Sequence, residues 1–208
     1  MPTDDLQHYH LSFTGASLRP ELSRIVAEYF LRHRDWAVTK RELLADNALQ
    51  SRSKNSRRVV EREIRQRAQM LTAAQLQLLA DATTDDRTAI AWLGVAKRYT
   101  FVFDFVTDVL LPKFAAHDLV VRPSDYETFV ERKKVSHPEL SALTPATAGK
   151  IRQVLFKMLV EAGLLRKGAA LGTIQRPVLS PQVARAIEAD SPHWLTAFLV
   201  PEDEAHGR

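Results

Sequence analysis

The fold is decided by residues 122–179, RPSDYETFVERKKVSHPELSALTPATAGKIRQVLFKMLVEAGLLRKGAALGTIQRPVL. A capping box, Ser124 followed by Glu127, predicts the start of a first helix. Pro138 and Pro145 predict two further helix starts, because proline in the first turn of a helix has no NH that must be bonded. The stretch is therefore predicted to contain three consecutive helices.

The third of these helices has a continuous apolar face at helical spacing, which predicts a long amphipathic helix. Its members are Ile151, Val154, Leu155, Met158, Leu159 and Ala162. Gly163 follows where a helix end favours a left-handed residue. Residues 166–177 then carry two glycines and three cations between short apolar pairs, which predicts a β-ribbon or wing. Three helices and a ribbon predict a winged-helix-like unit over residues 118–208.

The opposite face of the third helix carries Lys150, Gln153 and Lys157, spaced i, i+3 and i+7. A helix that enters a DNA major groove needs long polar side chains of this kind, so the spacing favours DNA contact. Lys167 or Arg176 would then touch phosphate from the wing. The alternative interpretation is a solvated face of an ordinary bundle helix.

A second basic segment lies at residues 53–71, which are predicted to form one helix. Between Arg52 and Arg67 the sequence has seven cations and two acids, a net charge of +5 that exceeds the +4 of the whole chain. Cations in a row can neutralise successive phosphates and release counterions. The predicted DNA contacts are Arg52, Lys54, Arg57, Arg58, Arg62 and Arg65. A solvated helix face with Glu–Arg pairs is the alternative.

The rest of the chain predicts a mostly α-helical protein in two parts. Helices at 20–33 and 36–46 precede the basic helix, and the three form a second helix-turn-helix-like series. The aromatic-rich residues 87–116 are expected to form core. The predicted parts are an N-terminal helical domain, 1–117, and a C-terminal winged-helix-like domain, 118–208, with a flexible polar tail at 201–208.

Composition argues against several classes of protein. The chain has no cysteine, which excludes disulfides, thiolate metal sites and thiol nucleophiles, and it fits a cytoplasmic location. We expect no signal peptide, because the acidic and polar start MPTDDLQHYH lacks a basic and an apolar region. We expect no membrane span, because four charges interrupt the most apolar stretch, 88–111. No glycine-rich phosphate loop, HExxH or GxSxG motif is present, so we expect no enzyme activity, cofactor, metal or small-molecule substrate.

Several segments, in order along the chain, resemble the BrxA family of BREX bacteriophage-defence systems. They are LSFTGASLRPELSRIVAEYFLRHRDW, NALQSRSKNSRRVVEREIRQRAQMLT, WLGVAKRYTFVFDFVTDVL and DYETFVERKKVSHPELSALTPATAGKIRQVLFKMLVEAGLL. The resemblance spans residues 9–186 approximately. It implies a mostly helical accessory protein that binds double-stranded DNA and works beside a methyltransferase, an ATPase and a phosphatase-like protein. It carries over no catalytic residues.

The sequence thus predicts a non-enzymatic protein that binds double-stranded DNA mainly through phosphate contacts. Two alternatives stay open at this point. One is a basic scaffold that recruits defence components without touching DNA, and the other is RNA binding through the basic helix.

Overall fold

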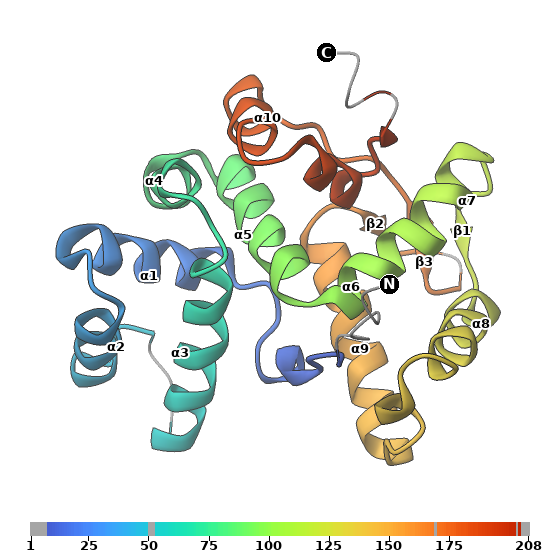
Figure 1. The fold of residues 1–208 in the computed structure, drawn as a ribbon, viewed down its shortest axis with the longest axis horizontal. Coiled ribbons are helices and arrows are strands. Elements are labelled where there is room, and N and C mark those ends of the chain that lie inside the picture. Colours follow the sequence, from blue (N-terminus) through green and yellow to red (C-terminus); the bar gives the residue numbers. More distant parts are fainter. Residues whose placement is uncertain (1–7, 50–52, 169, 203, 205–208) are drawn as a thin grey trace, which may run out of the picture.

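The computed structural model of the protein describes residues 8–49, 53–168, 170–202 and 204, and within them the chain is mostly helical (Figure 1). The α-helices are α1 (Pro20–His33), α2 (Trp36–Ala45), α3 (Lys54–Ala68), α4 (Ala73–Asp81), α5 (Thr84–Arg98), α6 (Thr100–Phe105), α7 (Leu111–Ala115), α8 (Pro123–Lys134), α9 (Pro145–Glu161) and α10 (Pro181–Glu188). Short 3-10 helices are η1 (Ser12–Gly15), η3 (Pro138–Leu140) and η4 (Pro192–Phe198). The prediction of a mostly α-helical fold is confirmed.

Helix α1 starts at Pro20 without a side-chain cap, whereas side-chain caps fix the starts of α2 and α3. The side chain of Asp35 accepts hydrogen bonds from the backbone NH groups of Ala37 and Val38, at 2.6 and 3.0 Å, which fixes the start of α2. Ser53 caps α3 in the same way. The predicted helices 20–33 and 36–46 agree with α1 and α2 to within one residue, and the basic helix ends at 68 rather than 71.

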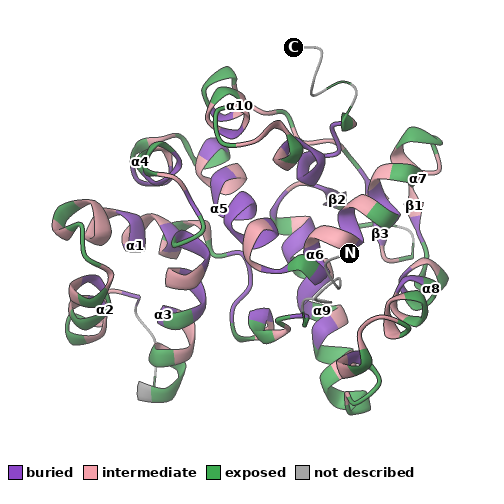
Figure 2. Cartoon of the chain, in the orientation of Figure 1, coloured by how far each residue is buried: buried purple, intermediate pink, exposed green. Residues whose placement is uncertain are grey.

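Helix α5 is the centre of the molecule and is surrounded by other helices (Figure 2). All seven residues from 90 to 96 are buried, so this helix has no solvated face along that length. The indole NH of Trp92 donates to the carbonyl oxygen of Ala197 in η4, at 2.9 Å. Gly94 allows α3 to approach closely, since a Cβ atom there would lie 3.0 Å from the carbonyl oxygen of Arg67.

The aromatic-rich segment continues as α6, a π-helical turn η2 (Val106–Leu110) and α7. Pro112 cannot donate a backbone hydrogen bond and would clash in a regular helix interior. The π turn immediately before it changes the hydrogen-bond register, so the helix passes Pro112 and ends at Ala115. Phe101, Phe105 and Val106 of this segment are fully buried, which agrees with the predicted core role.

A small antiparallel sheet lies beside α9 and consists of β1 (Val120–Val121), β2 (Leu165–Arg166) and β3 (Gly172–Ile174). Strand β3 is in the middle and pairs Thr173 with both Val120 and Arg166. The ribbon predicted after the third helix is therefore present as β2 and β3, whereas β1 was not expected.

Two local predictions in the C-terminal part need correction. The first helix begins at Pro123, because the carboxylate of Asp125 accepts from the backbone NH of Arg122 at 2.7 Å, so Ser124 and Glu127 do not form the capping box. The second helix is only the 3-10 turn η3, in which Leu140 is the one buried residue. The third helix, α9, follows the predicted apolar stripe, since Ile151, Val154, Leu155, Met158 and Leu159 are all buried.

Aromatic residues from before and after the predicted boundary at 117/118 pack against each other. The ring of Phe105 in α6 lies 5.2 Å from that of Phe129 in α8 and 5.5 Å from that of Phe156 in α9. Near the start of the described chain, the backbone NH of Tyr9 donates to Glu139 at 2.7 Å. The division into 1–117 and 118–208 stays a prediction.

The predicted flexible tail, 201–208, lies largely outside the described residues. Two of its described members contact other residues: Glu202 is hydrogen-bonded to His193 at 3.0 Å, and Glu204 forms an ion pair with Arg176 at 2.8 Å. Among the helices in the described ranges, none has the length and apolar character that a membrane crossing requires.

Candidate nucleic-acid interface

The predicted cations on α3 differ in what surrounds them. Arg52 and the side chain of Lys54 lie outside the part of the chain that the structure describes. Arg57 is half-buried and donates through Nη1 to the carbonyl oxygen of Leu44 near the end of α2, at 3.2 Å. Arg58 is exposed and forms no ion pair with any described residue. Arg57 thus joins two helices, whereas Arg58 faces solvent.

The two carboxylates of α3 are directed inward. Glu63 is fully buried and accepts hydrogen bonds from the hydroxyl groups of Tyr99 and Ser12, at 2.6 and 3.1 Å. Glu61 is also buried and is paired with Arg65, four residues later. Arg62 reaches Glu63 at 3.3 Å but keeps 53% of its side chain exposed. The acids of α3 therefore add little negative charge to the surface on which the arginines lie.

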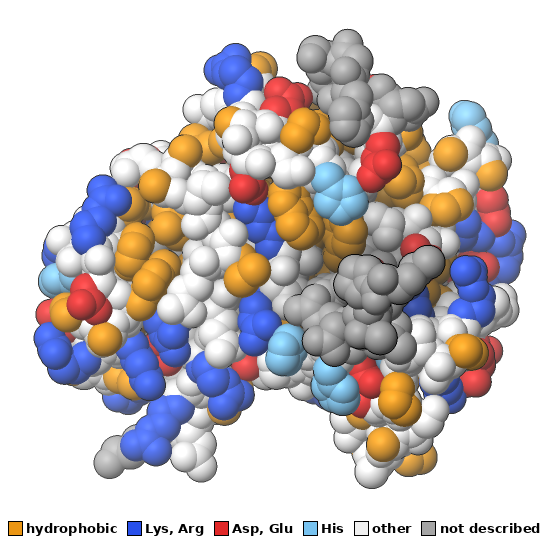
Figure 3. All heavy atoms as spheres, viewed as in Figure 1, with side chains coloured by type: hydrophobic (Ala, Val, Ile, Leu, Met, Phe, Trp, Pro, Cys, Tyr) orange, Lys and Arg blue, Asp and Glu red, His pale blue; other side chains and the backbone are white. Residues whose placement is uncertain are grey.

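Helices α2 and α3 form a hollow of about 250 Å³ between them. Its lining residues are Lys40, Leu44, Arg58, Glu61, Arg62 and Arg65. The hollow therefore brings three of the predicted α3 cations together with Lys40 of α2. Lys40 was not among the predicted DNA contacts. We call the exposed cations that line it, Lys40, Arg58 and Arg62, the α2–α3 surface. Figure 3 shows Lys and Arg side chains gathered over these two helices.

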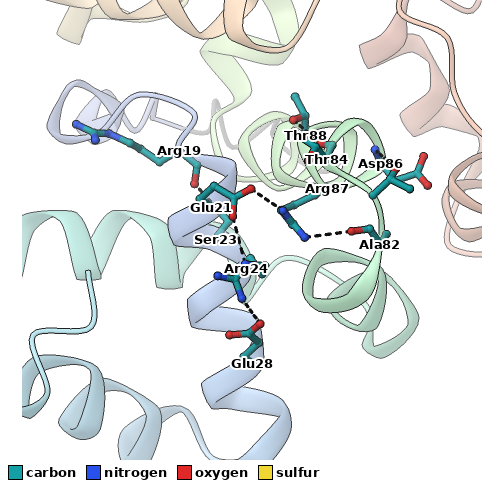
Figure 4. A network of polar contacts seen from close by, with 11 residues as sticks. Arg19, Glu21, Ser23, Arg24, Glu28, Ala82, Thr84, Asp86, Arg87 and Thr88 are labelled. Carbon is teal, nitrogen blue, oxygen red and sulfur yellow. Dashed lines mark hydrogen bonds and ion pairs between the residues drawn. The ribbon is translucent and has the colours of Figure 1, made fainter. Parts of the chain in front are cut away.

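Two other cations of the N-terminal part, Arg24 and Arg87, are balanced by nearby carboxylates (Figure 4). Arg87 of α5 binds Glu21 of α1 at 2.5 Å and the carbonyl oxygen of Ala82 at 3.1 Å. Arg24 pairs with both Glu21 and Glu28. The hydrogen bond from Arg87 is the main reason that the pKa of Glu21 lies below its usual value. This network holds α1 against α5 and leaves its cations compensated, unlike Lys40 and Arg58 of the α2–α3 surface, which form no ion pair with a described residue.

A second basic region, which we call the α9 surface, comprises the exposed residues Lys150, Gln153, Lys157, Arg166 and Lys167. Lys150 donates to the side-chain oxygen of Gln153 at 3.2 Å, so these two predicted contacts lie together. Lys157 is 56% exposed and lies 3.7 Å from Glu161. The α9 surface carries exposed charge, but part of the charge of Lys157 is compensated on its own helix.

The two cations predicted on the wing are placed differently. Lys167 is exposed immediately after β2, and no described residue pairs with it. Arg176 lies beyond the end of β3, and its two terminal nitrogens donate to both oxygens of Glu204 at 3.0 and 2.8 Å. A bidentate pair of this kind is among the stronger ion pairs, so Arg176 has less charge to offer an external anion.

The N-terminal ends of α3 and α9 point toward the same lower edge of the molecule (Figure 1). Figure 3 shows a concave outline along that edge, between the lobe with α2 and α3 and the lobe with α8 and α9. Lys and Arg side chains are dense on the first lobe and sparser at the tip of the second. The two basic regions are therefore on separate lobes, which the sequence could not establish.

These regions offer guanidinium and ammonium donors to an oxyanion, and phosphate is the common partner of such donors. In the residues that the structure describes, no three His, Asp or Glu side chains group in a way that would hold a metal ion. The geometry is that of an exposed, positively charged surface.

Together, fold and surface define a mostly helical protein with a small antiparallel sheet and two exposed basic regions. The chain belongs to the BrxA family of BREX defence systems, whose family model matches residues 7–191. It is similar to a protein named BREX protein BrxA from Bacillus cereus, with 22% identity over 150 residues that cover 72% of this chain and 75% of the relative. A protein of the same name from Escherichia coli is 24% identical over 149 residues, which cover 72% of this chain and 70% of the relative.

A solved structure has the same fold. It is the crystal structure of an uncharacterized protein from Magnetospirillum magneticum, which matches with a TM-score of 0.76 and 19% identity over 93% of this chain and 98% of the other. The resemblance to BrxA that was noted in the sequence is confirmed by the family match.

Proposed function

We propose that this chain is a non-enzymatic, cytoplasmic accessory protein of a BREX system that binds double-stranded DNA mainly through phosphate contacts. Its other partners would be further BREX components. The predicted methyltransferase, ATPase and phosphatase-like protein are the candidates, because the chain belongs to a family of BREX proteins.

The observation that carries the proposal is an excess of exposed cations around α2 and α3. Among the described residues from 32 to 65, the exposed cations are Arg32, Arg34, Lys40, Arg41, Arg58 and Arg62. The exposed carboxylates of the same range are Asp35 and Asp46. Six exposed cations against two exposed acids leave a net charge of +4 on the exposed side chains of this described range. A polyanion that replaces their counterions would bind there, with an affinity that depends steeply on salt.

The topology of the C-terminal part supports DNA binding independently of charge. A strand, helices α8 and α9, and two further strands in the order β1-β3-β2 are the arrangement expected of a winged helix. In such a unit α9 would approach the groove with Lys150 and Gln153, while Lys167 between the last two strands would touch the backbone. Helices α1, α2 and α3 would form the second, helix-turn-helix-like unit.

The test is a titration of duplex DNA with the full chain at about 50 and 200 mM salt, by fluorescence anisotropy. The variant is R58E/R62E, and its matched control is R132E/R185E, which makes the same charge change at exposed arginines of α8 and α10. We expect the first variant to weaken binding about thirtyfold and to lower the salt slope by about 2, because it removes two phosphate contacts. The control should lose less than threefold.

The same titration separates the alternatives. A scaffold that does not touch DNA would show no saturable binding at either salt concentration. An RNA-binding protein would release duplex DNA when structured RNA is added at equal concentration. Equal losses for R58E/R62E and its control would show that the α3 arginines are a solvated face.

A further inference from the structure

We propose that the hollow between α2 and α3 is a discrete site for one phosphate group of the DNA backbone, built from Lys40, Arg58 and Arg62. This inference deepens the proposed function and rests on it. A general basic surface attracts DNA anywhere along its length, whereas a discrete site places one phosphate at a fixed position and so sets the register of the helix on the duplex.

The charges around the hollow favour an anion. Its lining has four cations and one carboxylate, which leaves a net charge of +3. Counting Glu63, the buried partner of Arg62, still leaves +2. Lys40 and Arg58 have no carboxylate partner among the described residues, so their charge is available to a ligand.

The one carboxylate in the lining is neutralised by an arginine of the same helix. Glu61 is about 1% exposed and binds the guanidinium of Arg65, whose own side chain is largely covered. This pair forms a neutral wall of the hollow, and it also fixes Arg65 in place. The remaining three cations, Lys40, Arg58 and Arg62, come from two helices and converge on the same space.

The two walls of the hollow are joined to each other. Arg57 of α3 donates to the carbonyl oxygen of Leu44 in α2 at 3.2 Å, and Leu44 also lines the hollow. Asp35 fixes the other end of α2 through its capping hydrogen bonds. Donors on elements that are already fixed lose less conformational entropy when they bind, which favours this position over isolated surface lysines.

The size of the hollow suits one phosphate group. Its volume of about 250 Å³ equals that of about eight water molecules at roughly 30 Å³ each. A phosphate with its attached sugar and a few waters fits this space, whereas a base pair does not. The ligand class is therefore the phosphodiester backbone, which every DNA sequence presents.

The neighbouring residues Lys40 and Arg41 provide a matched pair for the test. Both are exposed cations of α2, and neither forms an ion pair with a described residue, but only Lys40 lines the hollow. We expect K40E to weaken duplex binding about tenfold and to lower the salt slope by about 1, as for the loss of one phosphate contact. R41E should weaken it less than threefold. Equal losses in K40E and R41E would overturn the inference, because the charges would then act as a diffuse field.

A second measurement is independent of DNA. Inorganic phosphate is titrated into the full chain, and the Nε–Hε signals of Arg58 and Arg62 are followed by NMR. We expect saturable shifts in the wild type and in R41E and their loss in K40E. Both variants change exposed residues, so circular dichroism should show unchanged folding.

The two measurements distinguish failure of the site from failure of the proposed function. Saturable phosphate shifts without any duplex binding would support the phosphate site and refute DNA binding. Duplex binding without phosphate shifts, and with equal effects of K40E and R41E, would support DNA binding and refute the site.

Discussion

The α2–α3 surface and the α9 surface carry similar numbers of exposed cations but arrange them differently. On the first, side chains from two helices surround one hollow, and the carboxylates of α3 are buried beneath it. On the second, the cations follow the length of α9 and β2, and Lys157 lies near Glu161 on its own helix. The number of cations alone therefore does not distinguish the two surfaces, whereas the position of the acids does.

The two surfaces are also held in place by different interactions. The α2–α3 surface depends on buried polar groups of α3, in which Arg67, Glu63 and Tyr99 are linked by hydrogen bonds. The α9 surface depends on aromatic packing of Tyr126 and Phe156 against Phe105. Three measurements test this comparison. The first two change the interactions that hold the surfaces in place, and the third changes the surface charges.

The largest expected effect comes from removing the buried cation beneath the α2–α3 surface. Arg67 donates to the carbonyl oxygens of Ser17 and Ala16, both at 2.7 Å, and is itself buried. We expect R67A to lower the free energy of unfolding by about 3 kcal/mol, because two buried acceptors lose their charged donor. Urea denaturation followed by circular dichroism measures the free energy of unfolding.

The control for this variant is R58A on the same helix, which removes an exposed arginine and should change the free energy of unfolding by less than about 0.5 kcal/mol. R58A should instead weaken DNA binding. Equal stabilities for R67A and R58A would contradict the distinction between a structural and a binding arginine on α3.

The next effect concerns the support of the α9 surface at alkaline pH. Burial raises the pKa of the Tyr126 phenol to about 12, above the usual value of 10.0. Below pH 10 the phenol is protonated in both the folded and the unfolded chain, so its ionisation does not reduce the free energy of unfolding. As pH rises through 10 toward 12, the unfolded chain releases this proton first, so the free energy of unfolding falls by about 2 kcal/mol.

The measurement is the difference in unfolding free energy between the wild type and Y126F, determined at pH 9 and at pH 11.5. The variant has no phenolic proton, so its stability should fall less steeply, and the difference between the two proteins should change by about 2 kcal/mol. Parallel pH profiles would mean that Tyr126 titrates equally in both states.

The smallest expected effect is on the charges of the α9 surface. We expect K150E/K157E to weaken duplex binding about fivefold, less than the thirtyfold expected for R58E/R62E, because exposed lysines on one helix face are well screened. Anisotropy titrations under identical salt conditions compare the two variants directly. A larger loss for K150E/K157E than for R58E/R62E would reverse the order of the two surfaces.

The sequence predicted those elements whose signals are local. The apolar stripe from Ile151 to Ala162 predicted α9, and the cation-rich segment predicted α3. Strand β1 gave no such signal, since it has two residues and its partner β3 lies about fifty residues later in the chain. The 3-10 helix η4 was also missed, because its buried residues have neither helical nor strand periodicity.

The sequence predicted the excess of cations on α3 but not the partner of each cation. The sequence indicated that α3 has more cations than nearby acids, and it could not show which arginines would use backbone carbonyl oxygens as partners, as Arg57 and Arg67 do. It gave no reason to place Lys40 beside Arg58, because packing of α2 on α3 decides this. The pairing of Arg176 with Glu204 likewise depends on where the chain returns after η4.

The aromatic contacts of Phe105 with α8 and α9 have a consequence for avidity. They hold α8 and α9 against α6, which packs on α5, and α5 in turn packs on α3, so the two basic regions are connected through packed helices. If one duplex meets both, the second contact forms at an effective concentration set by the separation of the two regions and not by the bulk solution. The curvature of the duplex then decides whether both contacts form, and pre-bent and straight DNA of identical sequence would differ in affinity.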